Sequence, residues 1–138
     1  MDKSRLQKML DAYEFHHILK IQVVDVADRH SVRLRLPFSP GYALVSATGN
    51  YHGGVLASLA DVAGTLACIV YGAKPFTTMQ MSIDFLESPR CCDLYASARV
   101  IKSWGKVSVA DVEITDEADT VYAVSRGSWS AVETVPQG

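Results

Sequence analysis

Cysteine is scarce in this sequence, and its placement excludes the usual cysteine-built sites. Cys68, Cys91 and Cys92 are an odd number of thiols, and two of them are adjacent. Their spacing matches that of no metal-ligand motif and no disulfide framework. The cysteine pattern therefore predicts a protein of a reducing, cytoplasmic compartment with no metal bound through these residues.

Long apolar runs and an excess of charge of one sign are also missing. No stretch approaches the roughly 18 uninterrupted apolar residues of a membrane span, and residues 1–15 lack the apolar run of a signal peptide. The 13 basic and 15 acidic residues are interspersed and give a net charge of −2 without a basic stripe. We therefore expect neither a membrane nor a nucleic acid as partner.

The remaining composition is that of an ordinary globular domain. The chain has 138 residues, of which 49% are hydrophobic and 20% charged, and it contains no internal repeat or linker. This length supports one core but not two. The sequence therefore predicts a single domain over residues 1–138.

Hydrophobic periodicity predicts a short amphipathic helix within residues 2–14. Apolar and polar residues then alternate over 19–23 and again over 32–36, which is typical of half-buried strands, and residues 28–30 join these two segments. Four further strands are predicted after Pro75, at 77–86, 94–103, 106–115 and 120–131. In the first of them, the predicted apolar and polar faces consist of Met79, Met81, Ile83 and Phe85, and of Thr78, Gln80, Ser82 and Asp84.

Residues 53–72 predict one long helix that is apolar on almost every side. Such a helix is a buried one, and at 1.5 Å per residue it would be roughly 30 Å long. The order of the elements and the short connections after Pro75 favour an α+β fold, with an antiparallel sheet of about six strands around this helix. The part of the helix that the sheet leaves uncovered would need a partner, so we expect a dimer.

Asp61 stands out because it lies within the apolar stretch LASLADVAGTLA. A buried carboxylate costs several kcal/mol unless it is paired or hydrogen-bonded, and a carboxylate beside apolar surface is suited to act as a base. At the start of the same helix, Gly53 and Gly54 would let a carbonyl approach unpaired backbone N–H groups. Those donors could stabilise the oxyanion that forms when the carbonyl is attacked.

The spacing of these groups decides how they can cooperate. Gly53 and Asp61 are eight residues apart, or about 12 Å along one helix. One carbonyl carbon cannot lie about 3 Å from both groups. If both serve one reaction, they must come from two copies of the helix that meet across a two-fold axis.

The segment NYHGGVLASLADVAG, residues 50–64, resembles the HGG…D signature of hotdog-fold acyl-CoA thioesterases of the PaaI-like (phenylacetyl-CoA pathway) group. The nine-residue step from His52 to Asp61 is the specific part of this match, and TTMQMSIDFL extends it after the helix. The likeness covers roughly residues 35–132. It implies the hotdog fold, in which a curved antiparallel sheet surrounds one long helix.

The resemblance also implies roles for individual residues. His52 and Gly53 match the loop that meets the thioester carbonyl, and the Gly53 N–H is the polarising donor. Asp61 matches the acid that acts as general base or nucleophile, and Thr78 lies where relatives often have Ser or Thr near the attacking water. Relatives bind coenzyme A at subunit interfaces and are commonly dimers or tetramers, with no cofactor implied.

The sequence departs from the pattern of the relatives at two places. Many of them have Asn six residues before the His, where this chain has Ser46, while Asn50 lies only two residues before it. Either Asn50 takes that role by another loop path or the hydrogen bond to the carbonyl is altered, so Ser46, Asn50 and Gly54 are all predicted to contact substrate. The second departure is Glu87, an apparent insertion in DFLESPR. The sequence does not identify the acyl group of the substrate, which could be aromatic or aliphatic.

Several alternatives remain beside hydrolysis of an acyl-CoA. His52 and Asp61 could serve a hotdog hydratase or dehydratase, and the chain could be a non-catalytic acyl-CoA-binding dimer. His16 and His17 do not predict a metal site, because neighbours on a strand face opposite ways, and Cys68 is predicted to be a buried, inert thiol. Two interpretations of six basic residues stay equally open: they contact coenzyme A phosphates, or they form a solvated strand face. These residues are Arg33, Arg35, Arg90, Arg99, Lys102 and Lys106.

Overall fold

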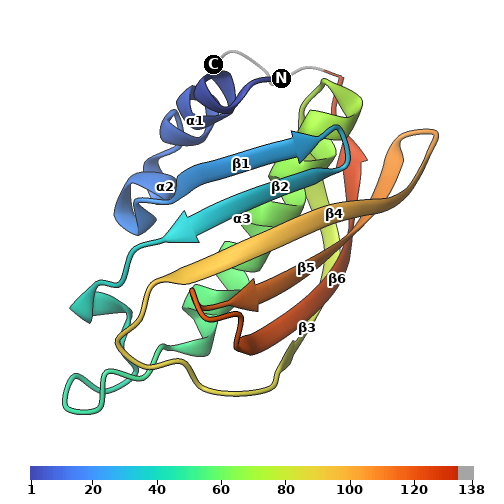
Figure 1. Cartoon of the computed structure of the whole chain (residues 1–138). Helices are drawn as coiled ribbons and strands as arrows, with labels where there is room; N and C mark the ends of the chain where they lie inside the picture. The colour runs from blue at the N-terminus through green and yellow to red at the C-terminus, as the bar shows by residue number, and fades with distance from the viewer. Residues whose placement is uncertain (134–138) are drawn as a thin grey trace.

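A six-stranded antiparallel sheet curves around one long helix in the computed structural model, which describes residues 1–133 (Figure 1). The last five residues of the predicted domain, 134–138, lie outside the described residues. The helices are α1 (Lys3–Asp11), α2 (Glu14–Leu19) and α3 (Gly53–Gly72), with a short 3₁₀ turn η1 (Pro40–Tyr42). The strands are β1 (Gln22–Asp28), β2 (Ser31–Leu36), β3 (Phe76–Phe85), β4 (Leu94–Trp104), β5 (Val107–Thr115) and β6 (Val121–Ala131).

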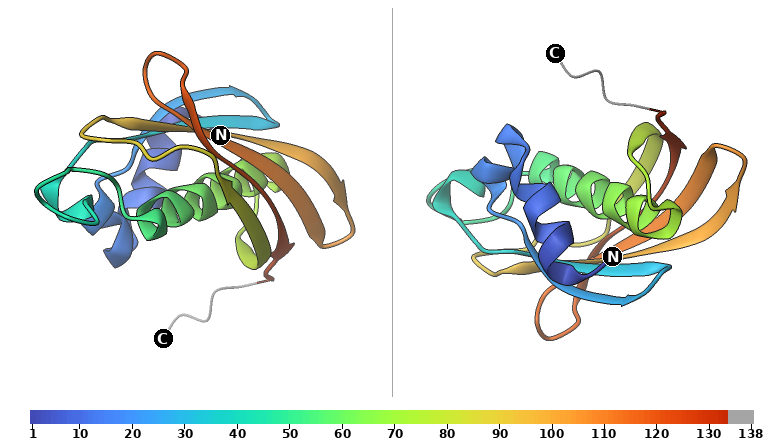
Figure 2. Two further views of the ribbon diagram at one scale, coloured as in Figure 1. Left: turned by 90° about the horizontal axis from the view of Figure 1, so that it is seen from below. Right: turned by 90° about the horizontal axis from the view of Figure 1, so that it is seen from above.

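The strands follow the order β1-β2-β4-β5-β6-β3, and every pair of neighbours is antiparallel. β1 and β3 are therefore the two edges of the sheet. The two views of Figure 2 show α3 held inside the curve of the sheet, with α1 and α2 beside it. This arrangement confirms the predicted α+β hotdog architecture and the predicted helix over residues 53–72.

The apolar composition of α3 reflects its place in the core. By length and hydropathy it could cross a membrane, but 61% of its most apolar 18-residue window is buried inside the protein. Its buried side chains pack against the inner faces of β2, β4, β5, β6 and β3. The inner face of the sheet therefore takes the place of water around the buried side chains of this helix.

The N-terminal region differs from its prediction. It forms two helices rather than one, and Leu19 ends α2 instead of beginning a strand. Lys20 adopts a left-handed conformation (φ 54°) and its N–H donates to the carbonyl of His16, which closes the helix. His16 and His17 consequently lie on a helix, so the argument from a strand against a metal site was based on the wrong element.

A β-bulge in β3 changes which face its first residues present. Thr78 pairs with Trp129 and Gln80 with Ser128, so Met79 is an extra residue between them. Directly paired residues share a face of the sheet, and Trp129 is fully buried against the helix side. Thr78 therefore faces α3, and the predicted strict alternation, which put Thr78 on the polar face, was wrong at this point.

Two glycines make room for the indole of Trp129 beneath α3. A Cβ at Gly64 would lie 2.3 Å from the indole ring, and one at Gly127 would lie 2.8 Å from it. Both distances are far shorter than any real contact of a Cβ atom. The close approach of α3 to β6 therefore depends on glycine at residue 64.

We expect Gly64→Ala to lower the free energy of unfolding by about 1–3 kcal/mol, because the added methyl overpacks a rigid buried ring. Gly41→Ala is the matched control, since no atom lies within 4 Å of a Cβ at that position. The control should stay within about 0.5 kcal/mol of the native chain. Urea denaturation of the three proteins measures this, and equal midpoints would contradict the packing argument.

Candidate active site

The first turn of α3 holds one backbone donor that no protein group uses. His52 is the N-cap residue, and its Nδ1 accepts a hydrogen bond of 2.9 Å from the Gly54 N–H. Among the hydrogen bonds of residues 1–133, none has the Gly53 N–H as donor. Since Nδ1 is an acceptor, the neutral His52 ring carries its proton on Nε2. The helix start therefore presents the Gly53 N–H and, from the ring, an Nε2–H donor.

Asp61 lies on the one side of α3 that the sheet leaves uncovered. Gly54, Ser58, Asp61 and Thr65 are spaced by four, three and four residues and so share a helix face, and none of the four is fully buried. The apolar sequence around Asp61 predicted a buried carboxylate, but in the structure Asp61 is only half-buried. It forms no salt bridge with any Lys, Arg or His that the structure describes.

The hydroxyl of Thr78 is the partner of this carboxylate. Its Oγ1 donates to Asp61 Oδ1 at 2.6 Å, the short distance typical of a bond to a charged acceptor. The structure thus brings together two of the predicted catalytic residues, Asp61 and Thr78. The bulge at Met79 is what turns the threonine toward the helix.

A second hydroxyl, which sequence reasoning missed, holds the same turn of α3 from beneath. Thr65 Oγ1 donates to the backbone carbonyl of Asp61 at 2.8 Å and accepts from Trp129 Nε1 at 2.8 Å. Trp129 is fully buried, and its paired residue on β3 is Thr78. Trp129 therefore fixes the Asp61 turn relative to the strand that supplies Thr78. The polar residue four positions after Asp61 was the available signal.

Gly53 and Asp61 line different cavities. A partly open space of about 210 Å³ beside Asp61 is bordered by α3, by the N-terminal helices and by the start of β3. A hollow of about 340 Å³ beside Gly53 is lined by Phe85, Leu86 and Glu87 at the end of β3, together with other residues of the same region. Glu87, the predicted insertion, thus lines the same hollow as Gly53.

The other predicted substrate contacts take separate positions. The side-chain amide of Asn50 donates to Ser88 Oγ at 3.0 Å, and Asn50 also forms a backbone bridge with Arg90. Ser46 lies in the exposed loop before His52, and Gly54 uses its N–H for the His52 ring. Asn50 therefore ties the loop before α3 to the loop before β4.

The remaining candidates are structural in this fold. Burial raises the pKa of Cys68 to about 12, which agrees with the prediction of an inert thiol. His16 Nδ1 lies 2.9 Å from the Leu10 carbonyl, to which it donates. No group of three or more metal-ligating side chains occurs within residues 1–133.

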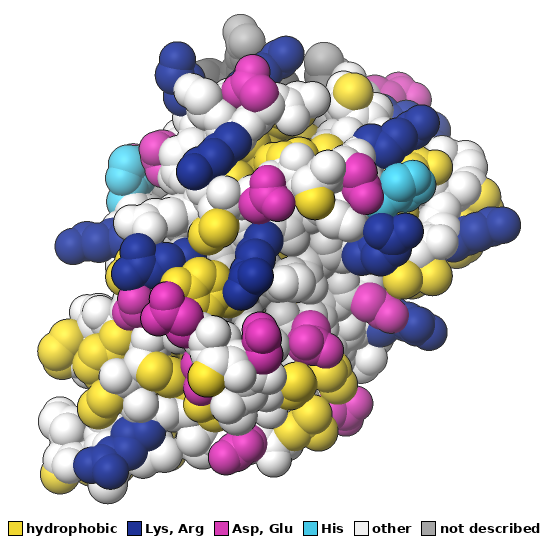
Figure 3. Space-filling view, viewed as in Figure 1, with side chains coloured by type: hydrophobic (Ala, Val, Ile, Leu, Met, Phe, Trp, Pro, Cys, Tyr) yellow, Lys and Arg dark blue, Asp and Glu magenta, His cyan; other side chains and the backbone are white. Residues whose placement is uncertain are grey.

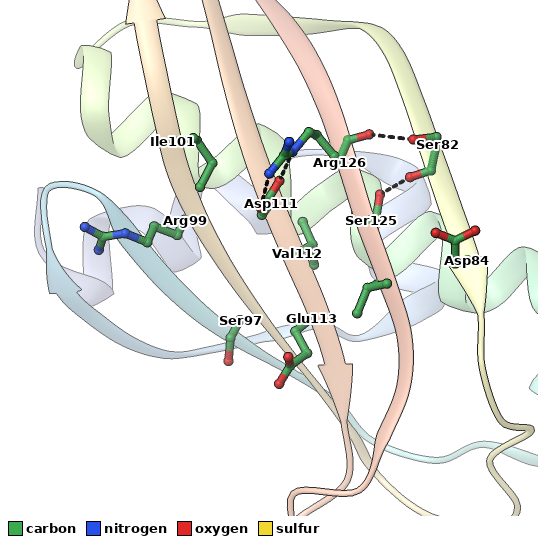
Figure 4. A pocket seen from close by; sticks show the side chains of 11 residues that line it. Ser82, Asp84, Ser97, Arg99, Ile101, Asp111, Val112, Glu113, Ser125 and Arg126 are labelled. Atoms are coloured by element: carbon green, nitrogen blue, oxygen red, sulfur yellow. Dashed lines mark hydrogen bonds and ion pairs between the residues drawn. The ribbon is translucent and has the colours of Figure 1, made fainter.

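The predicted basic residues are spread over the protein rather than gathered into one site. Arg35 pairs with Asp93 and Lys106 with Glu133. Charges of both signs are scattered over the outer face of the sheet (Figure 3). A shallow hollow of about 510 Å³ on that face contains the Arg126–Asp111 ion pair (Figure 4), which lowers the pKa of Asp111. This surface contains none of the predicted catalytic residues.

Comparison with known proteins agrees with the fold and with the type of site. A family model described as thioesterase superfamily matches residues 48–123, which include His52, Gly53, Asp61 and Thr78. The chain is 31% identical to a Halobacterium salinarum protein provisionally named an esterase, over 90% of this chain and 88% of that protein. The chain therefore belongs to the thioesterase superfamily. Membership of this superfamily supports a hydrolase activity on thioesters in general.

Solved structures with the same fold include the PaaI protein of the E. coli phenylacetic acid degradation operon. Its TM-score is 0.83 at 23% identity, with 94% of this chain and 91% of that chain covered. A thioesterase of Haemophilus influenzae gives a TM-score of 0.86 at 20% identity, with 99% and 94% covered. These likenesses confirm the hotdog fold.

We expect Thr78→Val to lower kcat of the thioesterase reaction by about tenfold to a hundredfold, because the carboxylate loses a charge-assisted hydrogen bond worth about 1.5–3 kcal/mol. Thr78→Ser keeps the hydroxyl and should retain most of the activity. Steady-state kinetics with a thiol-release assay measures both variants. Equal kcat values for the valine and serine variants would mean that the hydroxyl has no part in the reaction.

Proposed function

We propose that the protein hydrolyses an acyl-CoA thioester to the free acid and coenzyme A in active sites shared between two subunits. The Gly53 N–H of one protomer polarises the carbonyl, and Asp61 of the partner subunit activates the attacking water. The observation that carries this proposal concerns two groups about 12 Å apart on one helix. Within residues 1–133, the Gly53 N–H has no acceptor, and the Asp61 carboxylate accepts from Thr78 but forms no salt bridge. Neither can complete the site of its own protomer.

Two uncovered surfaces support pairing of two copies. β3 is an edge strand whose outer backbone groups have no neighbour in the sheet of the protomer, and Met79 at its bulge is 59% exposed. Asp61, on the open face of α3, is hydrogen-bonded to Thr78 of this strand. Antiparallel packing of two such helices would bring the Gly53 end of one beside Asp61 of the other. We accordingly expect a homodimer, and a homotetramer where dimers associate further.

The reaction then proceeds by ordinary acyl transfer to water. Asp61 removes a proton from water as its oxygen attacks the carbonyl carbon, while Thr78 orients the carboxylate. The oxyanion accepts hydrogen bonds from the Gly53 N–H and from His52 Nε2–H. The intermediate collapses with cleavage of the carbon–sulfur bond, and the proton held by Asp61 passes to the departing thiolate. Sulfur gives the carbonyl little resonance stabilisation, so modest activation suffices.

His52 favours hydrolysis over the hydratase alternative. Its Nδ1 is engaged by the Gly54 N–H, so the neutral ring offers only a donor at Nε2. A hydratase would need this histidine to exchange a proton with the substrate. In the present geometry the ring is instead suited to bind a carbonyl oxygen.

We assign the activity to the cytoplasm, in line with the cysteine pattern.

We expect Asp61→Asn to lower kcat by about two to four orders of magnitude, because the amide keeps the size of the side chain but cannot take a proton. The test is thiol release from a panel of acyl-CoA esters, with unfolding temperature as the check on the fold. Undiminished turnover in this variant would refute the mechanism. Ligand-dependent stabilisation without turnover in the native chain would indicate a binding protein instead.

A second pair of variants separates the Gly53 amide from the glycine itself. Gly53 is the first helical residue, where proline is tolerated, and His52 (φ −65°, ψ 132°) already has the extended backbone required before proline. Gly53→Pro therefore removes the N–H donor and should lower kcat by about a hundredfold to a thousandfold. Gly53→Ala is the control, because it retains the N–H and its Cβ makes ordinary contact with Phe85 at 3.4 Å.

The sharing of sites between subunits is tested by mixing these variants. A heterodimer of an Asp61→Asn subunit and a Gly53→Pro subunit contains one intact site and one doubly disabled site. Unfolding and refolding the mixture should regain about a quarter of the native activity, since half the dimers are mixed and each carries one of two sites. Absence of any regain, with heterodimers demonstrated by differential tagging, would show that each site lies within one chain.

A further inference from the structure

The cavity beside Asp61 is a partly open, mainly apolar space bordered by the N-terminal helices. α1 and the turn after it contribute Met9, Leu10 and Tyr13, α2 contributes His16, and the remaining lining comes from one side of α3 and the start of β3. We propose that this cavity binds the acyl group of the substrate and that Met9 and Tyr13 set an upper limit on its size. The inference rests on the proposed thioesterase function and adds the class of acyl group to it.

The chemistry of the walls fits an apolar occupant. Val62, Leu66, Ile69 and Phe76 line the side opposite the N-terminal helices. The hydroxyl of Thr65, which also lines the cavity, already bonds the Asp61 carbonyl and the Trp129 indole. An acyl group entering here therefore exchanges water for hydrocarbon and gains about 25 cal/mol for each Å² of apolar surface buried.

The position of Asp61 fixes which end of the substrate enters. Its side chain is on the cavity wall, so a carbonyl under attack by water at Asp61 would direct its acyl substituent into this space. The sulfur substituent would leave toward the hollow beside Gly53 of the other protomer, where Glu87 and Ser88 provide a more polar lining. The two cavities thus accommodate the two arms of one thioester.

The volume and the rigidity of the walls limit the occupant. An apolar cavity of about 150 Å³ holds benzene, so about 210 Å³ is suited to an acyl group of about six to ten heavy atoms, either a ring or a short chain. The rings of Tyr13 and His16 are 5.2 Å apart, and His16 is anchored to the Leu10 carbonyl at 2.9 Å. A long acyl chain would require this turn to move away from α3.

Substitutions at the two limiting residues test the inference. The native chain should give its highest kcat/KM with hexanoyl-CoA and benzoyl-CoA and much lower values with palmitoyl-CoA. Met9→Trp fills the cavity and should lower kcat/KM for hexanoyl-CoA and benzoyl-CoA by tenfold or more, leaving acetyl-CoA within about twofold. Tyr13→Ala opens the wall at a residue that is 56% exposed, and should raise the ratio of palmitoyl-CoA to hexanoyl-CoA hydrolysis. Lys8→Trp is the control, since it adds the same ring on an exposed side of α1.

The outcomes distinguish this inference from the function on which it rests. Failure of the native chain to release thiol from any ester would remove the proposed function. Native activity that depends on Asp61, together with unchanged acyl preference in Met9→Trp and Tyr13→Ala, would overturn the acyl cavity alone. If Met9→Trp lowers the unfolding temperature strongly, Tyr13→Ala decides, and an unchanged palmitoyl-to-hexanoyl ratio in that variant counts against the proposal.

Discussion

The rigidity of α3 is the constraint on which the rest of the site depends. A helix cannot bend its first turn onto its third, so the distance from the Gly53 N–H to the Asp61 carboxylate is set by the rise per residue. Within one chain these groups face separate cavities, one at the mouth of the β3–β4 loop and one under the N-terminal helices. Chemistry that used both groups on one substrate would therefore have to be assembled from two copies of the chain, as the proposed function requires.

Trp129 fixes the position of this rigid helix relative to the sheet. The indole fills the gap that Gly64 and Gly127 leave, and its N–H bonds the Thr65 hydroxyl, which bonds the backbone of Asp61. On the neighbouring strand β3, Thr78 pairs directly with Trp129, and the bulge at Met79 turns its side chain toward the same carboxylate. The acid is therefore held from two sides, once through its backbone and once through its side chain. A carboxylate held in this way is preorganised before any substrate binds.

The sequence predicted the elements whose signals are local. Apolar residues on every side defined the helix over 53–72, and period-two alternation with turn residues located the four later strands to within a residue or two. Asp61 was identified because a carboxylate in an apolar stretch has a physical cost. Gly53 was identified because the helix begins there. Both inferences depend only on residues near in the chain.

The features that the sequence did not predict depend on contacts between distant residues. The bulge in β3 is defined by its pairing with β6, so alternation within β3 alone placed Thr78 on the wrong face. Lys20 ends α2 in a left-handed conformation that favours glycine, and nothing in its residue type indicates a helix end. The link from Trp129 to Thr65 spans 64 positions, and no periodicity reports such a contact.

The proposed catalytic groups and parts of the cavity walls lie on different elements of the fold. The groups proposed to act on the thioester lie on α3, whose inner side is buried in the core, and on β3, which is held by its pairing with β6. Part of the wall of each cavity comes from other elements, namely α1 and α2 beside Asp61 and the loop after β3 beside Gly53. Substitutions in these outer elements change the volume and polarity of the cavities without moving Asp61 or Gly53. Under the proposed function, acyl preference can therefore vary within this fold while Gly53 and Asp61 stay in place, and Glu87, the predicted insertion, lines the hollow beside Gly53.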